Sequence, residues 1–109
     1  MSADGFVYFI ESGFGGPVKI GHAYNPSTRL RELQTGNQEE LHLLAMVPAG
    51  RWYEQELHQK FKHHRIAGEW FAPHVDIWPL IEKHWCYDED HGKRLHSVVG
   101  QYVHCHVVG

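Results

Sequence analysis

Two apolar segments flank a glycine-rich turn near the start of the chain, and this arrangement constrains the fold more than any other feature. Residues 6–10 read Phe-Val-Tyr-Phe-Ile, a run of aromatic and β-branched side chains that is typical of a β-strand. Residues 12–17, Ser-Gly-Phe-Gly-Gly-Pro, are turn-forming, and residues 18–21 form a second strand-like run. The sequence therefore predicts an antiparallel hairpin, because a tight turn joins antiparallel neighbours.

The register of this hairpin decides which side chains share a face. We expect Glu11 to pair with Gly16, which leaves a short loop and places Tyr8 opposite Lys19. Side chains alternate along a strand, so one face is uniformly apolar and should be buried, whereas Tyr8 and Lys19 share the other face. An ammonium group beside Tyr8 should lower the pKa of its phenol and let it accept a proton from water. An amphipathic hairpin with a solvent-facing Tyr–Lys pair is the alternative interpretation.

Further along the chain, helical and extended patterns alternate. Asn25-Pro26 is typical of a helix N-cap followed by proline at the first helical position. The clearest helical pattern has Tyr53, Leu57 and Phe61 recurring every four residues. The expected elements are a helix over 26–34 that stops near Gly36, a strand over 41–47, a helix over 51–65, an extended piece over 69–72 and a helix over 74–85.

This order of elements predicts an α/β fold of the α+β type, with a small three-stranded antiparallel sheet flanked by helices. A parallel doubly wound sheet is excluded because the first two strands are joined by a tight turn. The chain has 109 residues, the length of one ordinary domain. We expect a domain over residues 1–85 and a tail containing histidine and cysteine over residues 86–109.

The charge is unevenly distributed along the chain. The formal net charge of −3 is not that of a protein that coats nucleic acid by charge alone. Residues 17–65 carry seven Lys and Arg against five Glu, whereas residues 66–109 carry six acidic and three basic residues. A polyanion should therefore bind the middle of the chain. The sequence shows neither a membrane-spanning apolar segment nor a signal-peptide pattern, so a cytoplasmic protein is expected.

Two polar side chains on the expected helices are candidates for binding a phosphodiester. Arg29 falls on the first turns of the helix that follows the hairpin, and its planar guanidinium can bind two phosphate oxygens. Glu54 and His58 lie four residues apart and share one face of the next helix. A carboxylate at the edge of a core stripe can hold a hard cation such as Mg²⁺. A solvent-exposed arginine and an ordinary surface pair remain open as alternatives.

Four short motifs follow one another between residues 5 and 72. They are Phe6-Val7-Tyr8, Lys19-Ile20-Gly21, Arg29 within Arg-Leu-Arg-Glu-Leu-Gln-Thr-Gly, and the run from Glu54 to Phe61 followed by Arg65 and Gly68-Glu69-Trp70-Phe71. In this order and spacing they resemble the GIY-YIG nuclease superfamily, in the phage and bacterial branch that has Lys-Ile-Gly in place of the second tyrosine motif. The resemblance leaves the last third of the chain unexplained.

This resemblance implies a sheet of three antiparallel strands with helices, and the metal-dependent hydrolysis of DNA phosphodiester bonds. By position, Tyr8 would act as general base or proton relay, and Arg29 would stabilise charge on the phosphoryl oxygens. Glu54 would hold the metal ion, Mg²⁺ or Mn²⁺. Lys19 stands where many members have a second tyrosine. A protonated lysine is not a base, so Lys19 is expected to contact phosphate or to activate Tyr8.

Several further residues are candidates for secondary roles. His22 and His58 are alternative bases, because the unperturbed pKa of histidine lies nearer neutrality. Glu69 is close to these motifs in sequence, but it is equally suited to begin a structural strand. No DNA-recognition motif follows residue 86, so specificity is expected to be weak or to come from a protein partner. Contacts to the DNA are expected from Lys19, Arg31, Lys62 and Arg65.

The tail is rich in potential metal ligands. The chain contains eleven histidines, and the spacing of the late Cys and His residues matches no familiar zinc finger. A histidine-rich metal-binding or protein-interaction domain therefore competes with the nuclease hypothesis. A non-catalytic nucleic-acid-binding module of the same fold is a third hypothesis, which the small size and modest charge leave open. The late ligand candidates are Cys86, His91, His96, His104, Cys105 and His106.

Overall fold

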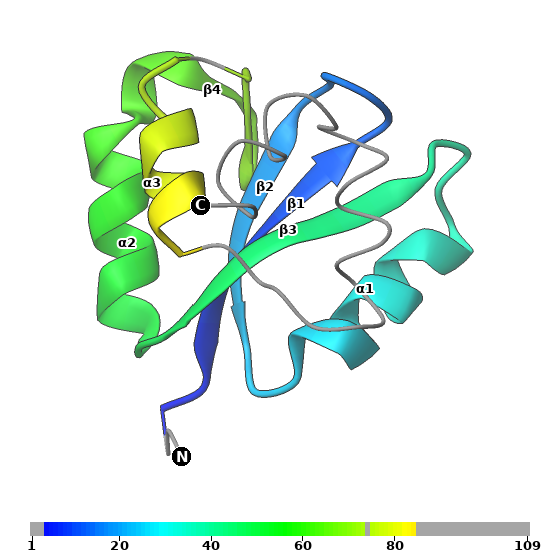
Figure 1. The fold of residues 1–109 in the computed structure, drawn as a ribbon, viewed down its shortest axis with the longest axis horizontal. Helices are drawn as coiled ribbons and strands as arrows, with labels where there is room; N and C mark the ends of the chain where they lie inside the picture. Colours follow the sequence, from blue (N-terminus) through cyan, green and yellow to red (C-terminus); the bar gives the residue numbers. More distant parts are fainter. Residues whose placement is uncertain (1–3, 74, 85–109) are drawn as a thin grey trace, which may run out of the picture.

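The computed structural model describes residues 4–73 and 75–84, and Figure 1 shows their arrangement. The expected α+β class is confirmed, with helices packed on an antiparallel sheet. Trp85, the tail over 86–109 and its Cys and His residues lie outside the described residues. The elements are β1 (Phe6–Ser12), β2 (Val18–Ala23), α1 (Pro26–Thr35), β3 (Leu41–Pro48), α2 (Arg51–Lys60), the 3-10 turn η1 (Lys62–His64), β4 (Arg65–Ala67), β5 (Trp70–Phe71) and α3 (Trp78–Lys83).

The sheet has five strands in the order β3-β1-β2-β5-β4, so the expected number of three strands is wrong. The extra strands arise because α2 ends at Lys60 rather than at residue 65, and the chain then turns back along β2. Gly68 has a φ of +55°, a left-handed conformation that glycine adopts without strain, and it forms the turn between β4 and β5. These strands contain three and two residues, too few to show an alternating pattern in the sequence.

The expected register of the first hairpin is also wrong, although the face assignment is kept. Tyr8 pairs with Gly21, and Lys19 pairs with Ile10. The loop has the expected length but starts one residue later, since the Ser12 N–H donates to the Pro17 carbonyl. Proline can accept this bond although it has no N–H to donate. The shift preserves the alternation of side chains, so Tyr8 and Lys19 still lie on one face without being directly opposite.

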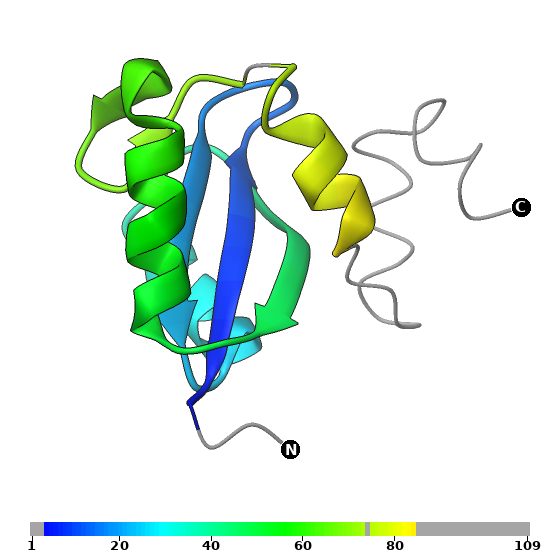
Figure 2. The same ribbon diagram turned by 90° about the vertical axis from the view of Figure 1, so that its left-hand side faces the viewer.

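Helices cover both faces of the sheet. Figure 1 shows α2 and α3 on one side of the sheet and α1 on the other, and in Figure 2 the face with α2 and α3 is toward the viewer. The expected apolar face of the hairpin is buried under α2 and α3, as predicted. The face that carries Tyr8 is buried as well, in a smaller core beneath α1. The larger core includes Val7, Phe9, Val18, Ile20, Leu57, Phe61, Phe71, Ile77 and Ile81, and the smaller core consists of Tyr8, Ile10, Leu30, Leu41 and Leu43.

The start of α1 follows directly from its sequence. The Asn25 side chain accepts a hydrogen bond of 3.1 Å from the Thr28 N–H, and Pro26 occupies the first turn. The helix ends at Thr35 with Gly36 as its C-cap, in agreement with the predicted stop near Gly36. The expected helix over 74–85 is shorter than predicted and spans Trp78–Lys83. Within the described part of the chain, no helix has the length and apolarity that a membrane crossing requires.

Glu11 is a buried carboxyl group at the end of β1. The residue is 1% exposed and lies opposite His42 in the register of β1 and β3. Its Oε2 accepts a hydrogen bond of 3.0 Å from the Gly15 N–H, whereas its Oε1 has no hydrogen-bond donor among the described residues. Burial raises the pKa of Glu11 from 4.5 to about 7, and the hydrogen bond from Gly15 opposes this shift only partly.

We expect the stability of the domain to fall between pH 5 and pH 8 because of Glu11. The raised pKa means that the contribution of this group is fully present below pH 4.5 and is lost as the pH rises through about 7. Glu11→Gln keeps an oxygen for Gly15 but cannot ionise. It should therefore stabilise the protein by roughly 2–3 kcal/mol more at pH 8 than at pH 5. Urea unfolding at the two pH values measures this, with exposed Glu56→Gln as control. An equal effect of Glu11→Gln at both values would contradict the expectation.

Candidate active site

The candidate residues lie near the part of β2 at which its pairing with β5 ends. In the described part of the chain, β5 pairs with β2 at Val18 and Lys19, and the Ile20 N–H donates a hydrogen bond of 3.0 Å to the Glu69 carbonyl oxygen. Among these described residues, the edge of β2 is therefore open from Gly21 onward. Helix α2 packs against β2 on one face of the sheet and α1 on the other (Figures 1 and 2). Side chains from β1, α1 and α2 can therefore approach the same part of β2.

Tyr8 and Gly21 form the centre of this region. A Cβ atom at position 21 would overlap the Tyr8 ring and hydroxyl, so the missing side chain of Gly21 provides the space that the phenol occupies. Tyr8 is 1% exposed, and burial raises the pKa of its phenol, while a hydrogen bond from Arg29 works in the opposite direction. The expected lowering of this pKa by Lys19 is wrong, because Lys19 lies opposite Ile10 and binds a carboxylate instead.

Arg29 approaches Tyr8 from α1. Its side chain is 44% exposed and forms an ion pair of 3.1 Å with Glu32, one turn further along the helix. The guanidinium thus contacts the buried phenol with one part and reaches solvent with another. A phosphate at this position could receive hydrogen bonds from its planar fork.

Lys19 is a buried cation that is already paired. Its ammonium group lies 2.9 Å from a carboxylate oxygen of Glu69 and 5.6 Å from the centroid of the Trp70 ring. Burial favours the neutral form of Glu69, but hydrogen bonds with Lys19 and Glu54 and the charge of Lys19 outweigh it, so the pKa of Glu69 is lowered. Lys19 therefore holds Glu69 in its ionised form and in a defined position.

Three potential metal ligands converge beside this pair. Glu54 and His58 come from α2 and Glu69 from the turn before β5, and their ligand atoms lie within 4.8 Å of one another. Nε2 of His58 lies 2.8 Å from the Ile20 carbonyl oxygen, which can only accept a hydrogen bond. The neutral ring therefore keeps an unprotonated Nδ1 that can act as a ligand.

Glu54 is the buried member of this cluster. It is 4% exposed, and its Oε2 receives no hydrogen bond from the described residues. Its Oε1 lies 3.8 Å from Nη1 of Arg51, whose side chain is mostly exposed. Burial raises the pKa of Glu54, and the adjacent Glu69 carboxyl raises it further. A buried carboxylate oxygen without a donor is unfavourable, so the residues present fit a bound cation.

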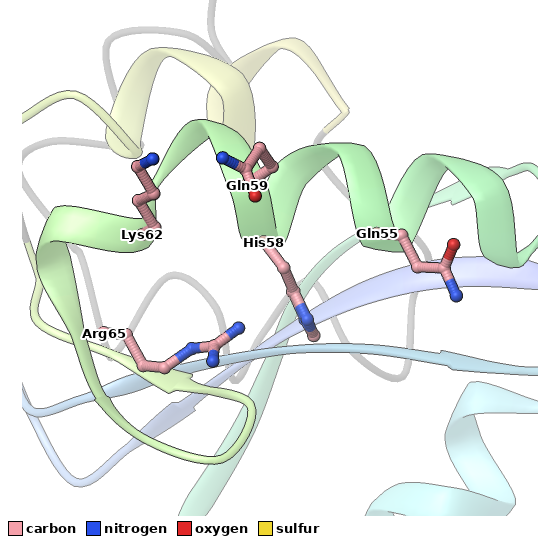
Figure 3. A pocket seen from close by; sticks show the side chains of 5 residues that line it. All are labelled: Gln55, His58, Gln59, Lys62 and Arg65. Carbon is pink, nitrogen blue, oxygen red and sulfur yellow. The ribbon is translucent and has the colours of Figure 1, made fainter.

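The other sequence candidates lie at varying distances from this centre. His22 is directed elsewhere, because its Nε2 contacts the carbonyl oxygens of Asp4 and Ala49 and its ring packs against Tyr24. Arg31 is exposed on α1. Lys62 and Arg65 lie near the end of α2, beside His58 (Figure 3).

Glu69 is the member of the site that the sequence did not assign. The available signal was its place in Gly-Glu-Trp-Phe, shortly after the Glu54 motif. Only the pairing of β5 with β2 brings it to Lys19, which is 50 residues away in the chain. A strand of two residues has no sequence pattern of its own. The sequence therefore does not distinguish whether Glu69, directly before this strand, is a metal ligand or a structural side chain.

Comparison with known protein families gives a match that covers most of the chain. A sequence profile described as the T5orf172 domain matches residues 5–86, which include every element from β1 to α3. Domains of this type are found in phage and bacterial nuclease-like proteins. Neither the search of curated proteins nor the search of solved structures found a match. Because the profile covers most of its length, the chain belongs to the T5orf172 domain family.

Proposed function

We propose that this protein is a metal-dependent endonuclease that hydrolyses DNA phosphodiester bonds through a GIY-YIG-type site. The observation that carries the proposal is the buried Glu54, whose unpartnered oxygen lies in a cluster of three potential ligands. The charges of Glu54, Glu69 and Arg29 all act on the Tyr8 phenol, which supports the proposal that the cluster and the Tyr–Arg pair act together. Membership of the T5orf172 family supports a nucleic-acid-related role.

Glu54, His58 and Glu69 would hold the metal ion. A bound divalent ion would supply Lewis-acid polarisation of the phosphate and stabilise the leaving oxygen. Mg²⁺ prefers oxygen ligands, whereas transition metals accept an imidazole nitrogen more readily. Between Mg²⁺ and Mn²⁺, the donor set of two carboxylates and one histidine therefore favours Mn²⁺.

The other side chains would act on the phosphate and on the attacking water. Arg29 would donate hydrogen bonds to the phosphoryl oxygens as their negative charge grows. Tyr8 would relay a proton: it would accept one from the attacking water and give its own to an oxygen of the substrate phosphate, because burial opposes a stable phenolate. Lys19 would keep Glu69 ionised and oriented. His58 donates to the Ile20 carbonyl and would offer its Nδ1 to the metal, and His22 contacts the carbonyl oxygens of Asp4 and Ala49. These contacts favour Tyr8 among the three candidate bases.

Nicking of supercoiled plasmid tests the proposed function. We expect nicking with Mn²⁺, slower nicking with Mg²⁺ and none with EDTA, since the nitrogen ligand favours the transition metal. The rate at which nicked plasmid forms should rise in proportion to the enzyme concentration. It should fall sharply in the variant Glu54→Gln. If neither ion supports nicking by protein that still retains DNA, the proposal is wrong.

A non-catalytic nucleic-acid-binding module is the second candidate. The observation that favours it is the state of the site itself, in which Lys19 is bound to Glu69 and the pKa of Tyr8 is raised. Salt-sensitive retention of DNA without cleavage in either metal would identify such a module. A protein partner that provides sequence specificity stays a prediction.

A further inference from the structure

We infer that a groove along α2 binds the sugar-phosphate backbone of DNA next to the candidate metal ligands. This inference rests on the proposed function and identifies the substrate-binding surface of the same site. The groove is an open hollow of about 430 Å³ between the end of α2 and β4 (Figure 3). Its lining residues are Gln55, His58, Gln59, Lys62 and Arg65.

His58 connects the groove to the metal-ligand cluster. The same side chain lines the hollow and belongs to the group formed with Glu54 and Glu69. Figure 3 shows its ring directed from α2 toward the sheet, between Gln55 and Arg65. A polymer that follows the groove would therefore contact one of the candidate metal ligands directly.

The charge of the groove distinguishes it from the rest of the site. The cations Lys19, Arg29 and Arg51 each lie within ion-pair distance of a carboxylate. Lys62 and Arg65 are exposed, and neither forms an ion pair with an acidic residue in the described ranges 4–73 and 75–84. Two uncompensated positive charges along one hollow favour a polyanion.

Phe71 holds the wall of the groove in place. The His58 ring lies 5.2 Å from the Phe71 ring, and the Arg65 guanidinium lies 5.7 Å from the centroid of the same ring. Phe71 is itself fully buried in the larger core. Arg65 is therefore positioned before any ligand binds, which reduces the entropy lost when it contacts a phosphate.

The chemistry of the lining favours the backbone of DNA over its bases. The groove presents two cations and the amides of Gln55 and Gln59, which can donate to phosphate and sugar oxygens. Among residues 4–73 and 75–84, no Trp, Tyr or Phe side chain on which a base would stack lines this groove. We therefore assign it to phosphate contacts that position the substrate rather than to recognition of its sequence.

The double variant Lys62→Ala/Arg65→Ala tests the groove through the salt dependence of DNA binding. Binding of a fluorescent duplex is measured by anisotropy from 50 to 200 mM salt, with Ca²⁺ present. We expect weaker binding for every duplex sequence and a log–log salt slope reduced by about 2, close to one per lost phosphate contact. The matched control is Lys60→Ala, because Lys60 is exposed at the end of α2, two residues before Lys62, but does not line the groove. Its slope should equal that of the wild type.

Further measurements separate the alternatives. Lys62→Ala alone should reduce the slope by about 1. This single variant keeps the Arg65–Phe71 contact, so it tests the groove even if the double variant does not fold. An unchanged slope in both variants would overturn the inference, even if the protein nicks DNA. A reduced slope in a protein that never nicks DNA would support the groove and contradict the endonuclease. Weaker binding of polyglutamate with an unchanged DNA slope would show that the groove takes an acidic polypeptide instead.

Discussion

Glu54→Gln is expected to abolish metal-dependent nicking, with a loss of roughly a thousandfold in the single-turnover rate. The amide keeps the size of the side chain but removes the negative charge of a buried oxygen that has no donor among the described residues. Metal catalysis contributes several kcal/mol to such reactions, and each 1.36 kcal/mol corresponds to a factor of ten. The rate is measured with saturating enzyme over a series of Mn²⁺ concentrations.

The control for this prediction is Glu56→Gln, an exposed carboxylate on the same helix. It should nick at the wild-type rate, and Glu54→Gln should still bind DNA in Ca²⁺. Binding of Mn²⁺ without DNA, followed by its electron paramagnetic resonance signal, should weaken in Glu54→Gln and not in the control. Wild-type nicking by Glu54→Gln would remove Glu54 from the site assignment.

Arg29→Ala is expected to lower the maximal nicking rate by about 100-fold to 1000-fold. This is the range found when one donor to a developing oxyanion is removed. The prediction follows from the geometry, since the half-exposed guanidinium reaches both Tyr8 and solvent at the open edge of β2. Arg29→Lys should recover only part of the rate, because an ammonium group cannot bind two phosphate oxygens as a planar fork.

Lys83→Ala is the matched control, since Lys83 is an exposed cation on α3 and has no contact with this site among the described residues. Rates of all three variants are compared at saturating DNA, so that a change in affinity does not enter. A maximal rate for Arg29→Ala equal to that of Lys83→Ala would contradict the role proposed for Arg29.

The hairpin shows how far local pattern can determine structure. Aromatic and β-branched residues around a glycine-rich turn predict both strands, and the alternation of their side chains predicts the face that carries Tyr8. The register was predicted one residue too early at each strand, because a loop of the same length closes both arrangements. Both registers also keep the same alternation, so the apolar pattern could not separate them.

Longer elements are predicted better than short ones, because a longer segment contains more local signals. The cap at Asn25 and the repeat of apolar residues on α2 are local signals that involve many residues. β4 and β5 form only because α2 ends early and Gly68 reverses the chain beside β2. Their pairing is a long-range contact, and segments of two or three residues contain no period that predicts it.

The residues of the candidate site fall into the same two groups, those placed by local sequence and those brought together by long-range packing. By itself, the sequence determined the local elements and placed Tyr8, Arg29 and Glu54 on them, since capping, periodicity and motif spacing are properties of neighbouring residues. Only the tertiary structure decided that Glu69 joins Glu54 and that Lys19 holds Glu69 rather than Tyr8. It also decided the direction of the Tyr8 pKa, because burial and the distances between charges depend on how distant segments pack.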